Sequence, residues 1–123
     1  MNAIFVLLGG GVGALCRYAL SSLAVGRLGG GFAWGTAVVN LAGCFMIGTA
    51  AGLVERSAMP RPLWLLLVTG FLGGFTTFST FSLETVTMLR SGETARAALN
   101  AGVNVLGGFA ATVAGLLLVV RGA

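Results

Sequence analysis

The chain has 123 residues, of which 57% are hydrophobic and 8% are charged, and its mean hydropathy is +1.01. A soluble domain carries about a quarter charged residues, whereas a disordered chain combines low hydrophobicity with high charge. The composition excludes both classes and indicates a membrane protein.

The few charges are seven Arg and three Glu, which give a net charge of +4. A basic chain raises the question of nucleic-acid binding, but these Arg residues are scattered singly and form no basic stripe. Because the chain has no His and only two Cys, a zinc site with the usual ligand spacing is excluded. Cys16 and Cys44 fall inside apolar stretches and are interpreted as small core residues.

Four apolar stretches follow one another, each near the roughly 20 residues that cross the hydrocarbon core of a bilayer. The first lacks the basic segment of a signal peptide, so we expect it to be retained as a helix. The separators are short and hold both prolines and most of the charge. We therefore predict an all-α membrane protein with a single four-span domain over 1–123, the spans covering about 3–25, 33–54, 63–89 and 97–120.

Glycine is abundant, at 21 of 123 residues, compared with an average usage of about 7%. Three pairs are spaced four apart, which allows helices to approach closely in lipid. Simple tolerance of glycine in membrane helices is the alternative interpretation of any single pair. Together they indicate tight packing: Gly9/Gly13, Gly48/Gly52 and Gly70/Gly74.

The arginines outside the spans are balanced across the predicted membrane. Four spans place Arg56, Arg61 and Arg121 on one side and the other three, Arg27, Arg90 and Arg96, opposite. The positive-inside rule then gives no preferred orientation. This balance is what a dual-topology protein that forms antiparallel dimers requires, although a chain with so few charges also reaches it by chance.

The third span, Leu63 to Leu89, is unusually long. Its 27 residues would extend about 40 Å as a helix, against a hydrocarbon core of about 30 Å. Gly73 and Gly74, followed by hydroxyl residues, predict a helix break at mid-membrane depth. Freed backbone groups there must be satisfied by protein or by a water-filled site, and freed carbonyls suit a small cation. A glycine kink within a continuous helix is the alternative.

Aromatic and polar side chains follow this break. Phe78 and Phe81 share one helical face, and phenyl edges are electropositive enough to face a dehydrated anion, although packing or lipid contact is the alternative. A second face carries a candidate polar track, with Ser79 and Ser82 beside it: Thr77, Thr80 and Glu84.

Glu84 is the only acid predicted inside a span, and Arg17 is the only base. Charges inside a membrane are functional candidates because burying them is expensive, although either side chain could instead reach the interface. Asn40 in the second span offers two amide donors to an anion, with interhelical hydrogen bonding as the alternative. Asn100 and Asn104 form a similar polar pair in the last span.

Three segments carry a family resemblance: GALCRY at 13–18, the stretch from Gly35-Thr36 through Asn40 to Gly43, and GGFTTFSTFS at 73–82. With these segments the sequence resembles the Fluc (CrcB) family of microbial fluoride channels over essentially its whole length. The resemblance implies an antiparallel, dual-topology homodimer in the cell inner membrane. It also implies two fluoride pores and a structural Na⁺ on the two-fold axis.

The resemblance further implies roles for individual residues. Phe78 and Phe81 correspond to the phenylalanine pair that lines the pores, and Asn40 to the pore asparagine. Gly73 and Thr76 correspond to the carbonyl donors to Na⁺, and Arg17 to the vestibule arginine. The polar track corresponds to Thr77, Ser79, Thr80 and Glu84, with Asn104 and Asn100 at fourth-span pore positions that vary within the family.

We therefore expect passive fluoride export that relieves fluoride toxicity. Fluoride is small and strongly hydrated, so a pore must replace its water with donors that do not trap it. The alternative is a small multidrug-resistance transporter, which also has four short spans and dual topology. Such exchangers need a Glu in the first span, but the only charged residue in the first span of this chain is Arg17. The sequence holds no nucleophile–base pair or metal-ligand cluster that predicts an enzyme.

Overall fold

The computed structural model describes residues 2–122, and its elements are all helical. The first two spans are single helices, α1 (Asn2–Leu28) and α2 (Trp34–Glu55). The third comprises α3 (Arg61–Trp64), the π-helical segment η1 (Leu65–Leu72), α4 (Gly73–Phe75) and α5 (Phe78–Arg90). The fourth comprises α6 (Thr94–Gly102), the π-helical segment η2 (Val103–Gly107) and α7 (Gly108–Arg121).

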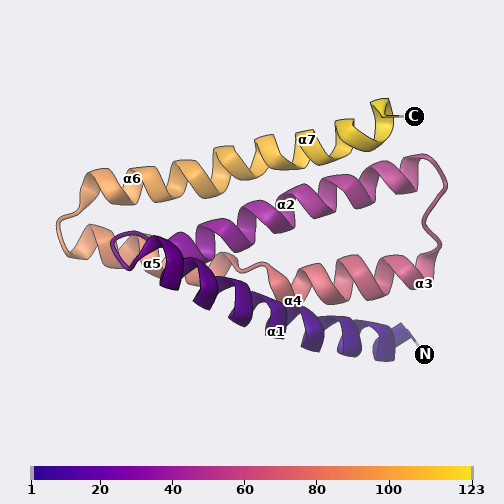
Figure 1. The fold of residues 1–123 in the computed structure, drawn as a ribbon, viewed down its shortest axis with the longest axis horizontal. Helices are drawn as coiled ribbons and strands as arrows, with labels where there is room; N and C mark the ends of the chain where they lie inside the picture. Colours follow the sequence, from indigo (N-terminus) through magenta and orange to yellow (C-terminus); the bar gives the residue numbers. More distant parts are fainter. Residues whose placement is uncertain (1, 123) are drawn as a thin grey trace.

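Four helical rods are long and apolar enough to cross a membrane, and they cover Asn2–Leu28, Trp34–Glu55, Arg61–Arg90 and Thr94–Arg121. This confirms the prediction of an all-α protein with four potential spans. Consecutive rods run in opposite directions, so both termini and the α2–α3 connection lie at one end (Figure 1). That end carries Arg56, Arg61 and Arg121, and the other three arginines outside the predicted spans lie at the opposite end.

Glycines allow the helices to approach backbone to backbone. A side chain on Gly48 or Gly115 would collide with the backbone of the facing helix, at the carbonyls of Thr112 and Phe45 respectively. These two positions hold α2 against α7. The predicted glycine pairs of the first and third spans face each other across α1 and η1–α4 in the same way, as Gly9, Gly13, Gly70 and Gly74.

The helical geometry of the third span is interrupted between α4 and α5. Gly73 is still helical, whereas Thr76 (φ −84°, ψ 158°) and Thr77 (φ −150°, ψ 112°) have extended backbones. The extended residues thus lie just after the glycine pair that the sequence indicated. The pair has another use here, because a Cβ on Gly74 would collide with the backbone of Gly10 on α1.

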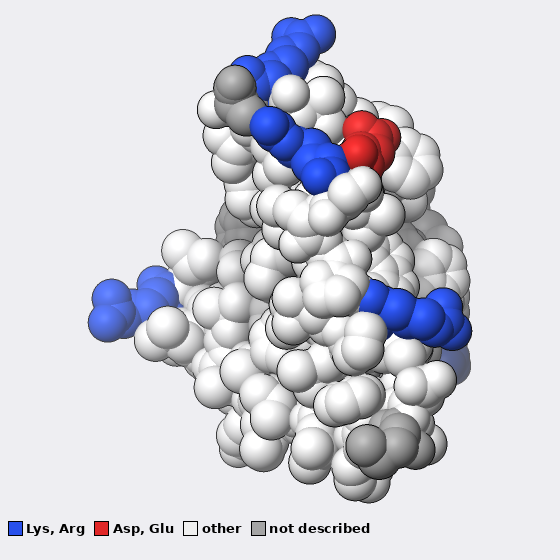
Figure 2. All heavy atoms as spheres, turned by 90° about the vertical axis from the view of Figure 1, so that its right-hand side faces the viewer, with Lys and Arg blue, Asp and Glu red and all other residues white. Residues whose placement is uncertain are grey.

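The outer surface is apolar, as expected for a lipid-facing protein. Large side chains such as Leu15 and Leu106 are exposed on 71% and 69% of their surface. Figure 2 looks along the helices onto the end that carries the termini, where blue arginines and one red acidic group stand out from otherwise uncharged residues. The buried apolar cluster is small and lies between α2, η1 and α4: Val39, Ala50, Val68, Leu72 and Phe75.

Candidate functional site

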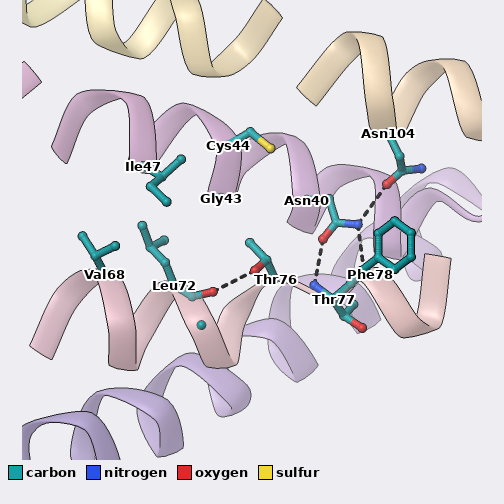
Figure 3. Close-up of a pocket in the computed structure, with 11 residues that line it drawn as sticks. Asn40, Gly43, Cys44, Ile47, Val68, Leu72, Thr76, Thr77, Phe78 and Asn104 are labelled. Atoms are coloured by element: carbon teal, nitrogen blue, oxygen red, sulfur yellow. Dashed lines mark hydrogen bonds between the residues drawn. The ribbon is translucent and has the colours of Figure 1, made fainter. Parts of the chain in front are cut away.

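The side chain of Asn40 on α2 pairs with the extended backbone of Thr77. Asn40 Oδ1 accepts a hydrogen bond from the Thr77 N–H (2.9 Å), and Asn40 Nδ2 donates to the Thr77 carbonyl (3.0 Å). The amide therefore satisfies both backbone groups of a residue that lies outside the helical ladder, as a polar backbone in a membrane interior requires. Figure 3 shows this pairing beside Phe78.

Thr77 also begins the next helix. Its hydroxyl Oγ1 accepts from the Thr80 N–H (3.2 Å), which is the N-cap arrangement. The same hydroxyl donates to Thr80 Oγ1 (3.1 Å) and lies 3.3 Å from Ser79 Oγ. Three residues of the predicted polar track are thus in direct contact at the start of α5.

These contacts free two carbonyls. In a continuous α-helix, the N–H groups of Thr77 and Thr80 would bond to the carbonyls of Gly73 and Thr76, four residues earlier. Both N–H groups instead bond to side-chain oxygens, of Asn40 and Thr77. The Gly73 and Thr76 carbonyls therefore lack the donors that a continuous α-helix would give them.

Arg17 lies at the same interruption. Its Nε donates to the Gly74 carbonyl at 3.1 Å, linking α1 to α4. Arg17 also lines a polar cavity of about 270 Å³ together with Thr36, Thr77 and Thr80. The guanidinium thus places a positive charge where α4 ends, a favourable position for a cation.

Asn40 lines a second cavity, of about 350 Å³, which Thr77 also lines. Thr76, Phe78 and Asn104 also line it (Figure 3), and so does Gly73. Asn40 Nδ2 donates to Asn104 Oδ1 at 2.9 Å as well as to Thr77. Both amide hydrogens of Asn40 therefore have protein acceptors.

The two phenylalanines predicted for a pore are in contact but differ in exposure. Phe78 is 76% exposed, whereas Phe81 is 8% exposed. Their ring centroids lie 5.4 Å apart at an interplanar angle of 71°, an edge-to-face pair. The edge of one ring is thus directed at the other, and Phe78 faces outward from the single chain.

Glu84 lies apart from the contacts around Thr77. It lines a different cavity, of about 360 Å³, with Thr87, Glu93 and Arg96. Its Oε1 is buried without a hydrogen-bond partner among residues 2–122, while the Thr36 hydroxyl is within reach of the carboxyl group. The structure therefore divides the predicted track, with Thr77, Ser79 and Thr80 together and Glu84 beyond them.

The predicted fourth-span asparagines lie inside the protein. Asn100 is fully buried and Asn104 is 9% exposed. Sequence reasoning assigned no site role to Thr85, whose hydroxyl accepts from Asn100 Nδ2, or to Thr36, which lines the cavity beside Arg17. Each lies one helical turn from a predicted site residue, Thr36 before Asn40 and Thr85 after Phe81, and this spacing was the available signal.

Four helices are long and apolar enough to cross a membrane, and the third is interrupted at a buried polar site. These two features place the chain in the class of small multi-pass membrane proteins with a polar interior. Within that class, the chain belongs to the family described as CrcB-like protein, Camphor Resistance (CrcB), whose model matches residues 4–116. The resemblance identified from the three sequence segments is thereby confirmed.

Relatives cover nearly the whole chain. It is 48% identical to a fluoride-specific ion channel FluC of Hyphomonas neptunium over 120 residues, which are 96% of this chain and 94% of the relative. It is 44% identical to a protein of the same name in Solibacter usitatus, with 98% and 100% covered. A third, from Rhizobium johnstonii, is 43% identical, with 94% of each covered.

Proposed function

We propose that this protein is a fluoride-selective ion channel that exports F⁻ passively across the cell inner membrane and so relieves fluoride toxicity. The observation that carries the proposal is the 48% identity, over 96% of the chain, to a relative named as a fluoride-specific channel. Passive conduction requires no catalytic group, so the protein acts as a channel and not as an enzyme.

The donors around Thr77 suit fluoride. Hydroxyls and an amide can replace the water of a small anion, and phenyl edges add a weak positive potential. An anion that takes the Asn40 hydrogen now donated to Asn104 leaves the pairing with Thr77 intact. Binding is then an exchange of one acceptor for another, weak enough to permit release.

The working unit in this proposal is an antiparallel homodimer with two pores. The equal split of six arginines between the two ends supports insertion in both orientations. The exposure of Phe78 on the single chain supports a second copy at that face. The partner would then complete the wall of each pore.

A structural Na⁺ at the two-fold axis fits the residues present. The described residues include no group of three His, Cys, Asp or Glu, whereas the diverted N–H groups leave the Gly73 and Thr76 carbonyls available. Carbonyl oxygens are ligands that hard cations accept. When bound, Na⁺ would supply positive charge that holds the two interruptions together.

The experiment is fluoride efflux from liposomes that contain the purified protein, followed with a fluoride electrode. Phe81→Ile removes a ring edge, and Asn40→Asp replaces an amide donor by a carboxylate. We expect both variants to lose fluoride efflux while still assembling as dimers on size-exclusion chromatography.

The matched control is Phe109→Ile, which changes an exposed phenylalanine on α7 and is expected to conduct normally. Unchanged efflux in both Phe81→Ile and Asn40→Asp contradicts the pore assignment. If the protein transports a cationic dye in a Glu84-dependent manner and does not transport fluoride, the multidrug-transporter alternative is favoured.

A further inference from the structure

A continuous series of hydrogen bonds connects the interruption at Thr77 with α5. It passes through side chains of α2, η2 and α6. Asn40 Nδ2 donates to Asn104 Oδ1 (2.9 Å), and Asn104 Nδ2 donates to Asn100 Oδ1 (3.2 Å) and to the Asn100 carbonyl (2.9 Å). Asn100 Nδ2 then donates to Thr85 Oγ1 (2.9 Å), whose hydroxyl donates to the Phe81 carbonyl (2.8 Å). We name this series the asparagine network: Thr77, Asn40, Asn104, Asn100, Thr85 and Phe81.

All bonds in the asparagine network point the same way. The N–H of Thr77 donates into it, each amide oxygen accepts from the preceding member, and each amide nitrogen donates to the next. Both ends are backbone groups of fixed character, a donor at Thr77 and an acceptor at Phe81. Turning any one amide over would set two N–H groups or two oxygens against each other, so the orientations fix one another.

The network is shielded from water where it is farthest from the interruption. Asn100 has no exposed surface and Asn104 has 9%. A buried donor that loses its acceptor cannot be rescued by solvent and carries the full cost of desolvation. Thr85 therefore matters beyond its own bond, because its hydroxyl is the acceptor for Asn100 Nδ2.

We propose that Asn100 and Thr85 are positioning residues: before an anion arrives, they hold the Asn104 amide so that its oxygen accepts the second Asn40 hydrogen, and they thereby set how Asn40 presents that hydrogen to a permeating anion. The inference rests on the proposed function for the identity of the anion. The network itself is independent of that identity. Its two ends lie at Thr77 and at the carbonyl of Phe81, so the network joins the interruption to the pore phenylalanine of the proposed channel.

The test substitutes Thr85. Thr85→Val keeps the shape of the side chain and removes the acceptor for Asn100, whereas Thr85→Ser keeps a hydroxyl. The matched control is Thr112→Val, which removes a similar hydroxyl bond to a carbonyl four residues earlier, that of Gly108 (3.0 Å), outside the network. Each variant is reconstituted, and its fluoride efflux and its fluoride-over-chloride permeability ratio are measured.

We expect Thr85→Val to lower fluoride efflux about tenfold, because an unsatisfied buried donor on Asn100 lowers the population of the oriented network by a factor of that order, and to lower the permeability ratio. Thr85→Ser and Thr112→Val are expected to retain both values. A variant that merely assembled poorly would lose flux without losing selectivity. Equal behaviour of Thr85→Val and Thr112→Val overturns the inference.

A second readout uses the unmodified protein and does not depend on transport. The side-chain amide hydrogens of the buried Asn100 and Asn104 are expected to exchange with solvent far more slowly than those of exposed Asn2 in an NMR hydrogen-exchange experiment. Rapid exchange at these two buried amides overturns the inference even if fluoride passes. Absence of fluoride flux with slow exchange instead overturns the proposed function and retains the network.

Discussion

Thr77 shows how much one residue can organise at an interruption. Its backbone is paired by Asn40, its hydroxyl caps α5, and its side chain borders two cavities, one lined by Arg17 and one by Asn104. Because the cap oxygen accepts from the Thr80 N–H, it stabilises the first turn of α5 independently of any transported ion.

Replacing Thr77 by Val removes that cap while keeping the branched shape. We expect the free energy of unfolding to fall by about 1 kcal/mol, the usual value for a lost N-cap. Unfolding in mixed detergent micelles, followed by circular dichroism, measures the change. Thr77→Ser retains a cap oxygen and is expected to stay close to the wild type, so equal loss in both variants contradicts the capping role.

At the scale of the element, sequence alone predicted the four apolar stretches because each carries its signal locally, as a long apolar run. The site was predictable only in part. Asn40 and Thr77 were both identified, but their pairing joins residues 37 apart in the sequence. The extended conformation of Thr77 depends on its pairing with Asn40 of α2, and Gly74 packs against α1. The local sequence therefore could not show whether a glycine serves close helix packing or marks a break in the helix.

The close contact of α2 and α7 gives a prediction for the elements as a pair. Gly115→Ala would press a methyl group against the Phe45 carbonyl, and overpacking of this kind typically costs about 1–3 kcal/mol. We expect the free energy of unfolding to fall by this amount when unfolding is followed by circular dichroism in mixed detergent micelles.

Gly102→Ala is the control for that prediction. A Cβ at Gly102 has no heavy atom of another group within 4 Å, and alanine is the better helix former by roughly 0.5–1 kcal/mol. Gly102→Ala should therefore be as stable as the wild type or more so. A Gly115→Ala protein of unchanged stability contradicts the backbone contact.

For the whole molecule, the scarcity of charge gives each arginine a large share in deciding orientation. Three arginines mark each end, so removing two from one end leaves one against three. The proposed antiparallel pair needs both orientations in the same membrane, which makes orientation a condition of flux.

Arg27→Gln combined with Arg90→Gln is expected to bias insertion toward one orientation and to reduce fluoride efflux in cells. Protease accessibility of a C-terminal tag in sealed vesicles measures the orientation, with about half of the wild-type tags accessible if insertion is unbiased. Arg61→Gln combined with Arg90→Gln takes one charge from each end and is expected to preserve the mixture. A single orientation in the wild type excludes dual topology.

The uniform direction of the asparagine network also limits how this protein can vary. An amide that is replaced by a group of different length or donor number leaves its neighbours with mismatched partners, on both sides. Substitutions at positions 40, 85, 100 and 104 are therefore expected to occur together. A single substitution that changes the hydrogen-bonding group would reduce function, whereas a compensating pair would be tolerated. Related proteins whose interiors are lined by amides and those whose interiors are lined by hydroxyls would then be separated by single-substitution intermediates of low fitness.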